Sequence, residues 1–284
     1  MLYRIVIASA AALMLTLFSG LGTNVANAVA IDCLADGCTV SDNGANIFVD
    51  TDEGELTAFS VGGMEHVFEE EFHFCLDGCG GDLNRELSDN FSLSSAMQTG
   101  NMITVVFDGD GNGLRLTIDL TLTGGTNTAT VNETATLDVI ERYGVSLDNI
   151  VLSEYDDFDL NDSSGGDTVR YDGTSFIQTD GNTTLVLTST PFDFFDVEAC
   201  CESNILSDRL INGHLAGNAG PFGPDDVAFA LEYDIDLSQL DSFTISKTKT
   251  ITIASGEPIP EPSTLAIFGL GLLGLGLRRR RRTR

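Results

Sequence analysis

The chain has 284 residues, and its 14 Lys and Arg are outnumbered by 43 Asp and Glu, which gives a net charge of −29. Such a charge disfavours nucleic acid and anionic membrane surfaces as partners, because like-charged phosphates need compensating cations, and it suits divalent cations instead. Trp is absent, so the preferred stacking platform of many sugar-binding sites is missing.

The N-terminus predicts a secretory signal peptide over residues 1–30. Arg4 precedes an apolar run from Ile5 to Phe18, and small residues then offer A-x-A cleavage sites for signal peptidase after Ala28 or Ala30. We therefore expect the rest of the chain to be exported, with an extracellular domain over residues 31–256.

The six cysteines are expected to form disulfides, because an even number in an exported chain meets an oxidising environment. Local closure of the first two pairs forces a bond between adjacent residues, which is strained by their short Cα separation. A mixed pattern that ties the N-terminal loops to the region near residue 200 is equally open. The residues are Cys33, Cys38, Cys75, Cys79, Cys200 and Cys201.

Residues 65–74 combine acidic residues with two histidines and three phenylalanines. In a strand, Glu69, Glu71 and His73 share one face. Glu71 and His73 could supply two zinc ligands at this face, and His214 is the remaining histidine that could complete a site. The sequence has no H-E-x-x-H motif, however. The segment is therefore predicted to be an acidic strand that faces solvent.

Through the middle of the chain, apolar residues recur with a period of two. In residues 114–122 every even position is apolar and every odd one is polar, which is typical of a strand with one face in a core. Short strands between Gly, Asn and Asp clusters predict an all-β fold, an antiparallel β-sandwich, with short helices only near residues 83–87 and 202–211. The expected strands cover residues 102–107, 114–122, 129–131, 136–139, 175–177, 185–188 and 227–233.

Residues 108–113 read Asp-Gly-Asp-Gly-Asn-Gly. Asp108, Asp110 and Asn112, with Asp119 in the last position, fit the calcium-loop pattern except that an Asp replaces its final Glu. The flanking strands argue against an EF-hand, and a hairpin turn explains the same residues because Gly and Asn tolerate positive φ. A turn without metal is preferred, and calcium at this turn is the alternative.

A second acidic cluster covers residues 156–162, with Asp157, Asp159 and Asn161 at alternate positions. It is predicted to be a solvated loop. Carboxylates are so abundant that two placed for glycoside hydrolysis cannot be recognised among them, and the G-x-S-x-G motif of serine hydrolases does not occur.

Threonine recurs at every second position in several segments. These runs place hydroxyl and methyl groups in a row on one face of a strand. Ordinary β-propensity at solvent-facing positions is the preferred explanation, and an ice-binding face is the alternative. The residues are Thr121, Thr123, Thr126, Thr128, Thr130, Thr134, Thr136, Thr244, Thr248, Thr250 and Thr252.

The C-terminal segment, residues 257–284, combines three features. Pro260, Glu261 and Pro262 belong to a stiff, extended strip, because proline fixes its own φ and restrains the residue before it. Residues 264–277 are uncharged and predict an apolar helix that is shorter than the roughly 20 residues of a stable membrane span. The arginines of residues 278–284 favour the cytoplasmic side, which places the domain outside the inner membrane.

This tail closely resembles the PEP-CTERM sorting domain of Gram-negative bacteria that make exopolysaccharide, also known as the ice-binding protein C-terminal domain. The resemblance implies recognition by an exosortase, cleavage near Pro260, Glu261 and Pro262, and a transient stage in the inner membrane before release or transfer to the surface. An ordinary C-terminal anchor is the alternative. The resemblance covers the tail alone and implies a destination rather than an activity.

Three functional classes follow. The preferred one is a non-enzymatic structural or adhesive protein of the cell surface or exopolysaccharide matrix, with calcium as an optional cofactor and no nucleic-acid partner. A carbohydrate- or ice-binding module is second. A secreted hydrolase is third, because we find no catalytic signature in the sequence.

Overall fold

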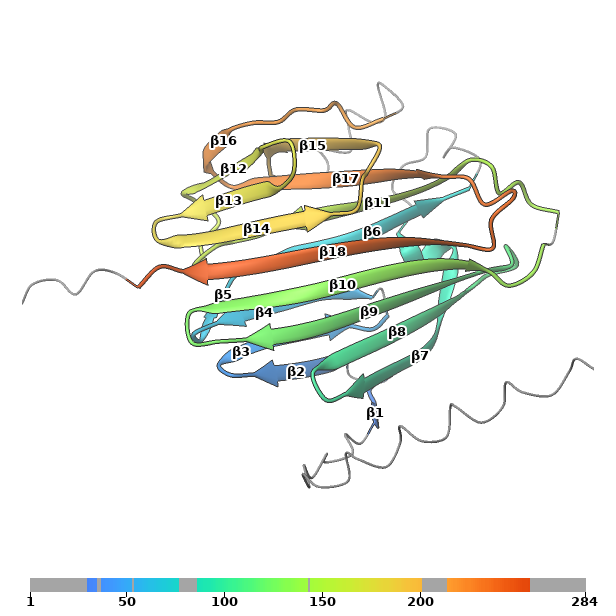
Figure 1. Ribbon diagram of the computed structural model, residues 1–284, viewed down its shortest axis with the longest axis horizontal. Helices are drawn as coiled ribbons and strands as arrows, with labels where there is room; N and C mark the ends of the chain where they lie inside the picture. Colours follow the sequence, from blue (N-terminus) through green and yellow to red (C-terminus); the bar gives the residue numbers. More distant parts are fainter. Residues whose placement is uncertain are drawn as a thin grey trace, which may run out of the picture.

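The domain consists of three antiparallel sheets. The structure, a computed structural model, describes residues 30–34, 37–52, 54–76, 86–142, 144–200 and 214–255. Figure 1 looks onto the largest sheet, sheet A, with the smaller sheets B and C behind it.

Sheet A has ten strands, in the order β1 (Ala30–Asp32), β7 (Phe91–Thr99), β8 (Met102–Gly109), β9 (Leu114–Gly124), β10 (Thr128–Val139), β18 (Ser242–Ile253), β14 (Thr183–Ser189), β13 (Phe176–Asp180), β12 (Asp167–Tyr171) and β16 (Phe222–Asp225). Sheet B has the order β2 (Cys38–Asp42), β3 (Ala45–Asp50), β4 (Glu55–Val61) and β5 (Met64–Glu65). Sheet C has the order β15 (Phe194–Ala199), β17 (Val227–Ile235), β11 (Ile150–Asp157) and β6 (Glu69–Cys75).

The core lies between sheet A and the two smaller sheets. In β9 the buried positions alternate with partly exposed ones from Leu114 to Leu122, as the sequence pattern predicts. Strands β9, β10 and β18 pair along their lengths without a bulge, so their inward side chains stay in register. Buried apolar side chains from all three sheets form one main cluster, and two small clusters, one with Tyr155 and one with Val151, lie apart from it on sheet C. The predicted all-β antiparallel sandwich is therefore confirmed.

Sheet B approaches the backbone of sheet A closely at Gly124. The Gly124 amide donates a hydrogen bond of 2.8 Å to the side chain of Asp42 in β2. A Cβ atom at Gly124 would lie 1.8 Å from the carbonyl oxygen of Asp42, so only glycine fits this position.

The sequence predictions of individual elements have mixed outcomes. Every expected strand is found, and residues 129–131 and 136–139 are parts of the single strand β10. Of the expected helix at residues 83–87, only Leu87 lies in a described helix, the 3-10 helix η2 (Leu87–Asp89). The predicted signal peptide through residue 29, the helix at residues 202–211 and the tail lie outside the described residues. No helix in the described part of the chain is long and apolar enough to cross a membrane.

Two predictions about acidic segments are wrong. The strand at residues 65–74 does not simply face solvent, because Glu70 and His73 of β6 are buried, whereas Glu69 and Glu71 stay partly exposed. The cluster at residues 156–162 is not simply a solvated loop, because β11 extends to Asp157 and both Asp156 and Asp157 are buried. Both segments belong to sheet C, whose inner face packs on sheet A.

Candidate functional site

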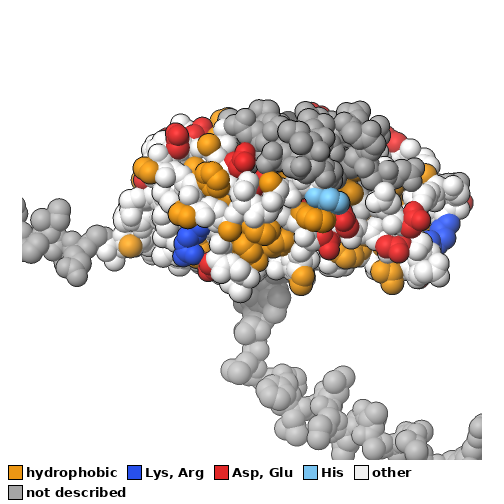
Figure 2. Space-filling model, turned by 90° about the horizontal axis from the view of Figure 1, so that it is seen from above, with side chains coloured by type: hydrophobic (Ala, Val, Ile, Leu, Met, Phe, Trp, Pro, Cys, Tyr) orange, Lys and Arg blue, Asp and Glu red, His pale blue; other side chains and the backbone are white. Residues whose placement is uncertain are grey.

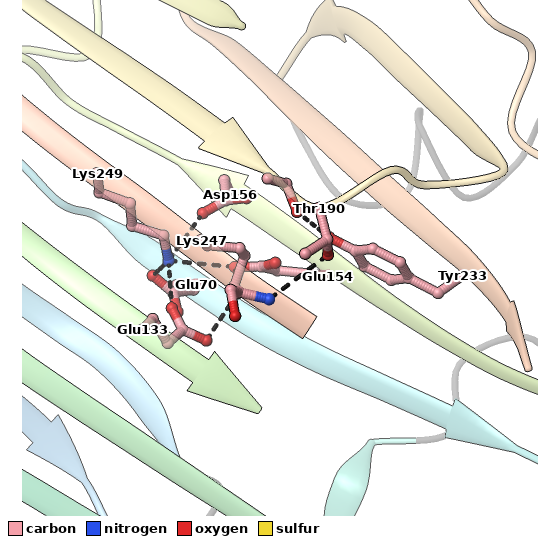
Figure 3. Close-up of polar contacts among 10 residues, drawn as sticks. Glu70, Glu133, Glu154, Asp156, Thr190, Tyr233, Lys247 and Lys249 are labelled. Carbon is pink, nitrogen blue, oxygen red and sulfur yellow. Dashed lines mark hydrogen bonds and ion pairs between the residues drawn. The ribbon is translucent and has the colours of Figure 1, made fainter. Parts of the chain in front are cut away.

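A group of charged side chains lies in the core between sheets A and C, and we call it the ionic cluster (Figure 3). Sheet A contributes Lys247 and Lys249 from β18 and a glutamate from β10, and sheet C contributes the other three carboxylates. All six residues are at most 2% exposed. The cluster consists of Glu70, Glu133, Glu154, Asp156, Lys247 and Lys249.

Lys249 is surrounded by carboxylates. Its ammonium nitrogen pairs with Glu70, and it lies 3.0 Å from Glu133, 3.1 Å from Glu154 and 3.4 Å from Asp156. An ammonium ion has three donors and no acceptor, so this arrangement uses its full hydrogen-bonding capacity.

Lys247, two residues before Lys249 on the same face of β18, completes the ionic cluster. Its nitrogen lies 2.7 Å from Glu133, pairs with Glu154, and sits 4.5 Å from the centre of the Phe72 ring. Glu133 is the cross-strand partner of Lys247 within sheet A, whereas Glu154 reaches it from sheet C. The cluster therefore links the two sheets by charge as well as by apolar contact.

Burial and charge balance determine which carboxyls ionise. Burial raises the pKa of Asp156 to about 7, and the neighbouring charge of Glu154 adds to the increase. Burial also raises the pKa of Glu70 well above its ordinary value despite the nearby Lys249. For Glu133, burial opposes ionisation, but Lys247 and Lys249 outweigh it and lower the pKa to about 2. The two lysines therefore favour ionisation of Glu133, whereas burial favours the protonated forms of Glu70 and Asp156.

The outer face of sheet C carries a second set of polar side chains. Glu69, Glu71 and His73 share this face, as predicted. His73 lies 3.3 Å from Glu71, and the hydrogen bond from His73 lowers the pKa of Glu71. This part of the strand is polar, but His73 is almost completely covered.

The two histidines considered for zinc are engaged differently. His214 does not join Glu71 and His73; its Nδ1 lies 2.9 Å from Glu232 of β17, and its ring stacks on Phe194 at 3.9 Å. Among the described residues, His214 forms a group with Glu232 and Asp234, whose possible metal-ligand atoms lie within 4.8 Å of one another. His73 and His214, which the sequence analysis considered together as zinc ligands, therefore have different partners in the structure.

Asp157 is a further buried carboxyl on the outer face of sheet C. Its Oδ2 accepts a hydrogen bond of 3.2 Å from the Tyr155 hydroxyl and lies 3.2 Å from the sulfur of Cys200. Burial raises its pKa to about 7, and the charges of Asp226 and Asp159 add to the increase. Because Cys200 is disulfide-bonded, its sulfur carries no proton to share and is no thiolate ligand.

The candidate calcium turn is the β8–β9 hairpin. Asp108 pairs with Arg115 at 2.7 Å, and the Asp110 carboxylate accepts a hydrogen bond of 2.8 Å from Ser92. The side chain of Asn112 accepts a hydrogen bond from the Leu114 amide at 2.9 Å, and Asp119 accepts one from Thr104. Each of the four side chains thus has a local partner, and calcium at this turn remains a prediction.

Disulfide pairing is resolved for the first two cysteines. Cys33 and Cys38 are bonded, with their Cα atoms 5.4 Å apart, so this pair closes locally. Cys75 and Cys200 are also disulfide-bonded. Cys79 and Cys201 lie outside the described residues, and the remaining connectivity stays open.

The outer face of sheet A is covered with hydroxyl groups along its central strands. Three pairs of threonines join β10 to β18 through hydroxyl contacts: Thr128 with Thr252 at 3.2 Å, Thr130 with Thr250 at 3.0 Å, and Thr136 with Thr244 at 3.3 Å. We call the outward residues of these two strands between positions 128 and 136 and between positions 244 and 252 the threonine face. Its members are Thr128, Thr130, Asn132, Thr134, Thr136, Thr244, Ser246, Thr248, Thr250 and Thr252.

None of these ten residues is charged, although the chain has a net charge of −29 and the charged residues Asp138 of β10 and Asp119 of β9 border the face. Figure 2 shows a different side of the molecule, where acidic side chains are scattered among apolar and neutral ones. The predicted solvent-facing threonine rows are confirmed, and their contrast with the rest of the chain makes this face a candidate contact surface.

Comparison with known protein families identifies the C-terminal segment. A family model described as the PEP-CTERM protein-sorting motif matches residues 258–281. The predicted sorting signal is therefore confirmed. It implies export through the inner membrane to the cell surface and recognition by an exosortase. No curated protein matches the chain.

The fold is similar to part of a solved bacterial glucoamylase. A crystal structure of a bacterial glucoamylase complexed with acarbose matches 86% of this chain with a TM-score of 0.55 and 13% identity, and the chain spans 37% of that glucoamylase. A putative aldose 1-epimerase from Escherichia coli K12 matches 76% of this chain and 99% of its own length, with 9% identity and a TM-score of 0.43. At these identities the glucoamylase match indicates a shared fold.

Proposed function

We propose that the chain is a non-enzymatic structural or adhesive protein of the cell surface or exopolysaccharide matrix. The observation that carries the proposal is the sorting motif at residues 258–281, which begins a few residues after β18, the last strand that the structure describes. The exosortase recognises this motif, cuts near Pro260, Glu261 and Pro262, and transfers or releases the upstream sandwich.

The most tightly grouped titratable side chains support a structural role. In the ionic cluster, the four carboxylates face two ammonium groups and are sealed between the sheets. A catalytic pair of carboxylates must reach a substrate, whereas these side chains are at most 2% exposed. The ionic cluster therefore has a structural role in the fold rather than a catalytic one.

Replacing Pro260, Glu261 and Pro262 together by alanine is expected to block processing. The stiff, extended strip is lost, so the uncleaved chain accumulates in the inner membrane. Fractionation and mass spectrometry of the chain in a host with an exosortase measure this result. Replacing the exposed Ser163 and Ser164 by alanine is the control and leaves processing intact. Normal processing of the triple variant contradicts the proposal.

The threonine face is the surface that we assign to adhesion. It presents hydroxyl and methyl groups without charge, and the cross-strand hydroxyl contacts hold several side chains in place before a partner binds. A neutral, hydroxyl-rich polysaccharide fits this chemistry better than an acidic one, because the −29 chain repels anions.

Replacing Thr130 and Thr250 by aspartate is expected to reduce adsorption to an insoluble neutral glucan at least several-fold. Two charges in the centre of the face add a desolvation cost that the glucan does not offset. A sedimentation assay measures bound protein, and Ser164→Asp adds charge in a loop as the control. Equal adsorption of both variants rules out this face. Inhibition of ice recrystallisation without glucan binding favours ice as the ligand, and release of soluble sugar contradicts the non-enzymatic role.

A further inference from the structure

We propose that the ionic cluster is the site of a spontaneous covalent modification: an amide bond between the amine of Lys249 in β18 and the side-chain carboxyl of Glu70 in β6. The two residues lie 179 positions apart in the chain and belong to opposite sheets. Such a bond crosslinks the two layers of the sandwich.

The geometry places the reacting groups together. The nitrogen of Lys249 contacts Oε2 of Glu70, and both side chains are at most 1% exposed. An amine and a carboxyl that are held in contact have a high effective concentration, which replaces the entropic cost of a bimolecular encounter. Apolar neighbours such as Phe72 exclude the water that would reverse the reaction.

Glu133 is placed to move the proton. It lies 3.0 Å from Lys249 and 2.7 Å from Lys247, and these charges keep it ionised. Glu133 removes one proton from the ammonium of Lys249, which gives a neutral amine. Burial keeps Glu70 in its protonated form, because its pKa lies well above the ordinary value, and a neutral carboxyl is the better electrophile.

The bond then forms by condensation. The nitrogen of Lys249 attacks Cδ of Glu70, the hydroxyl of Glu70 leaves, and Glu133 gives its proton to that hydroxyl while it accepts the second proton from nitrogen. The products are one amide and one water molecule, and Glu133 ends protonated. No oxidant, reductant or energy source is needed. The amide also replaces a buried ammonium ion and a buried acid with a neutral group.

The position of the bond gives it a mechanical role. Strand β18 ends at Ile253, and the sorting motif begins at residue 258, so tension on an attached protein enters the domain through β18. An amide from Lys249 to Glu70 transmits that tension to β6 in sheet C rather than to hydrogen bonds alone. The bond forms in the folded domain whatever its final location.

Peptide mass spectrometry of the exported full chain tests the bond directly. The purified protein is reduced, alkylated and digested, which removes disulfide links from consideration. We expect a joined pair of peptides, one with Glu70 and one with Lys249, lighter by one water than the two peptides together. Quantitative recovery of the two unlinked peptides overturns the proposal, as does a bond from Lys249 to another acid.

Matched variants identify the roles of the three residues. Lys249→Arg keeps the charge but gives no joined peptide. Glu70→Gln gives the same joined peptide as the wild type, because ammonia leaves in place of water. Glu133→Gln gives a folded protein, checked by circular dichroism, in which the two peptides stay separate. Formation of the joined peptide in Glu133→Gln overturns the role of Glu133.

Discussion

Replacing Lys247 by methionine is expected to lower the free energy of unfolding by about 3 to 5 kcal/mol, the usual penalty for removing one partner of a buried ion pair. Lys247 pairs with Glu133 and Glu154, and neither carboxylate can turn to water because both are fully covered. Methionine fills much of the volume but carries no charge, so the loss measures the removal of one positive charge from a cluster in which both carboxylates then share Lys249. Denaturant unfolding followed by far-UV circular dichroism measures it, since the chain has no Trp.

Arg115→Met provides the matched control for Lys247→Met. Arg115 pairs with Asp108 at 2.7 Å on the outer face of sheet A, and the two side chains are 41% and 46% exposed. Water screens such a pair, so its removal leaves the unfolding midpoint unchanged within error. Equal effects of the Lys247 and Arg115 variants contradict a buried position for Lys247.

The protein is expected to be more stable at pH 5 than at pH 8. Burial raises the folded-state pKa of Asp156 to about 7, from an ordinary value of 3.8 in the unfolded chain. Burial also raises the pKa of Asp157 and of Asp167 to about 7. Each group binds its proton more tightly in the folded state, so stability is lost as pH rises from about 4 to 7.

The size of this effect follows from the shift. Raising the pKa of one buried carboxyl from 3.8 to about 7 corresponds to a free energy on the order of 4 kcal/mol over the whole titration, of which about 3 kcal/mol falls between pH 5 and pH 8. While Lys249 is unlinked, Glu133 does not contribute within this window, because its pKa of about 2 leaves it ionised at both pH values. Thermal unfolding at pH 5 and pH 8, at constant ionic strength, measures the difference in melting temperature.

The variant Asp156→Asn separates the ionic cluster from the general repulsion among acidic residues. Asparagine imitates the protonated acid and cannot ionise, so the variant is expected to lose less stability between pH 5 and pH 8 than the wild type. If both proteins show the same pH dependence, Asp156 is not the group that titrates.

The architecture was accessible from the sequence because period-two alternation is a local signal. Residues 114–122 alternate without exception, and β9 buries every even position. The hairpin turn at residues 108–113 was equally local, since Gly111 and Gly113 adopt the positive φ that glycine favours. The pairing of sheets B and C with sheet A was not accessible, because it depends on contacts between residues far apart in the chain.

The ionic cluster was missed although β18 carried a usable signal. In residues 244–252 the threonines share one face, so Lys247 and Lys249 necessarily share the other, and β10 places Glu133 on the same side. Lysine is almost never fully buried unless it is paired, so the two lysines alone do not indicate a buried cluster. The partners Glu70, Glu154 and Asp156 come from sheet C, and no local pattern specifies that they meet these lysines.

The most direct test of the account is the double variant Lys247→Met with Glu154→Leu, measured beside both single variants by denaturant unfolding. If charge pairing across sheets A and C holds this core together, each single change leaves an uncompensated charge, whereas the double change removes both. The double variant is then more stable than either single variant. Loss of stability in the double variant equal to the sum of the two single losses contradicts the pairing of Lys247 with Glu154 in the core.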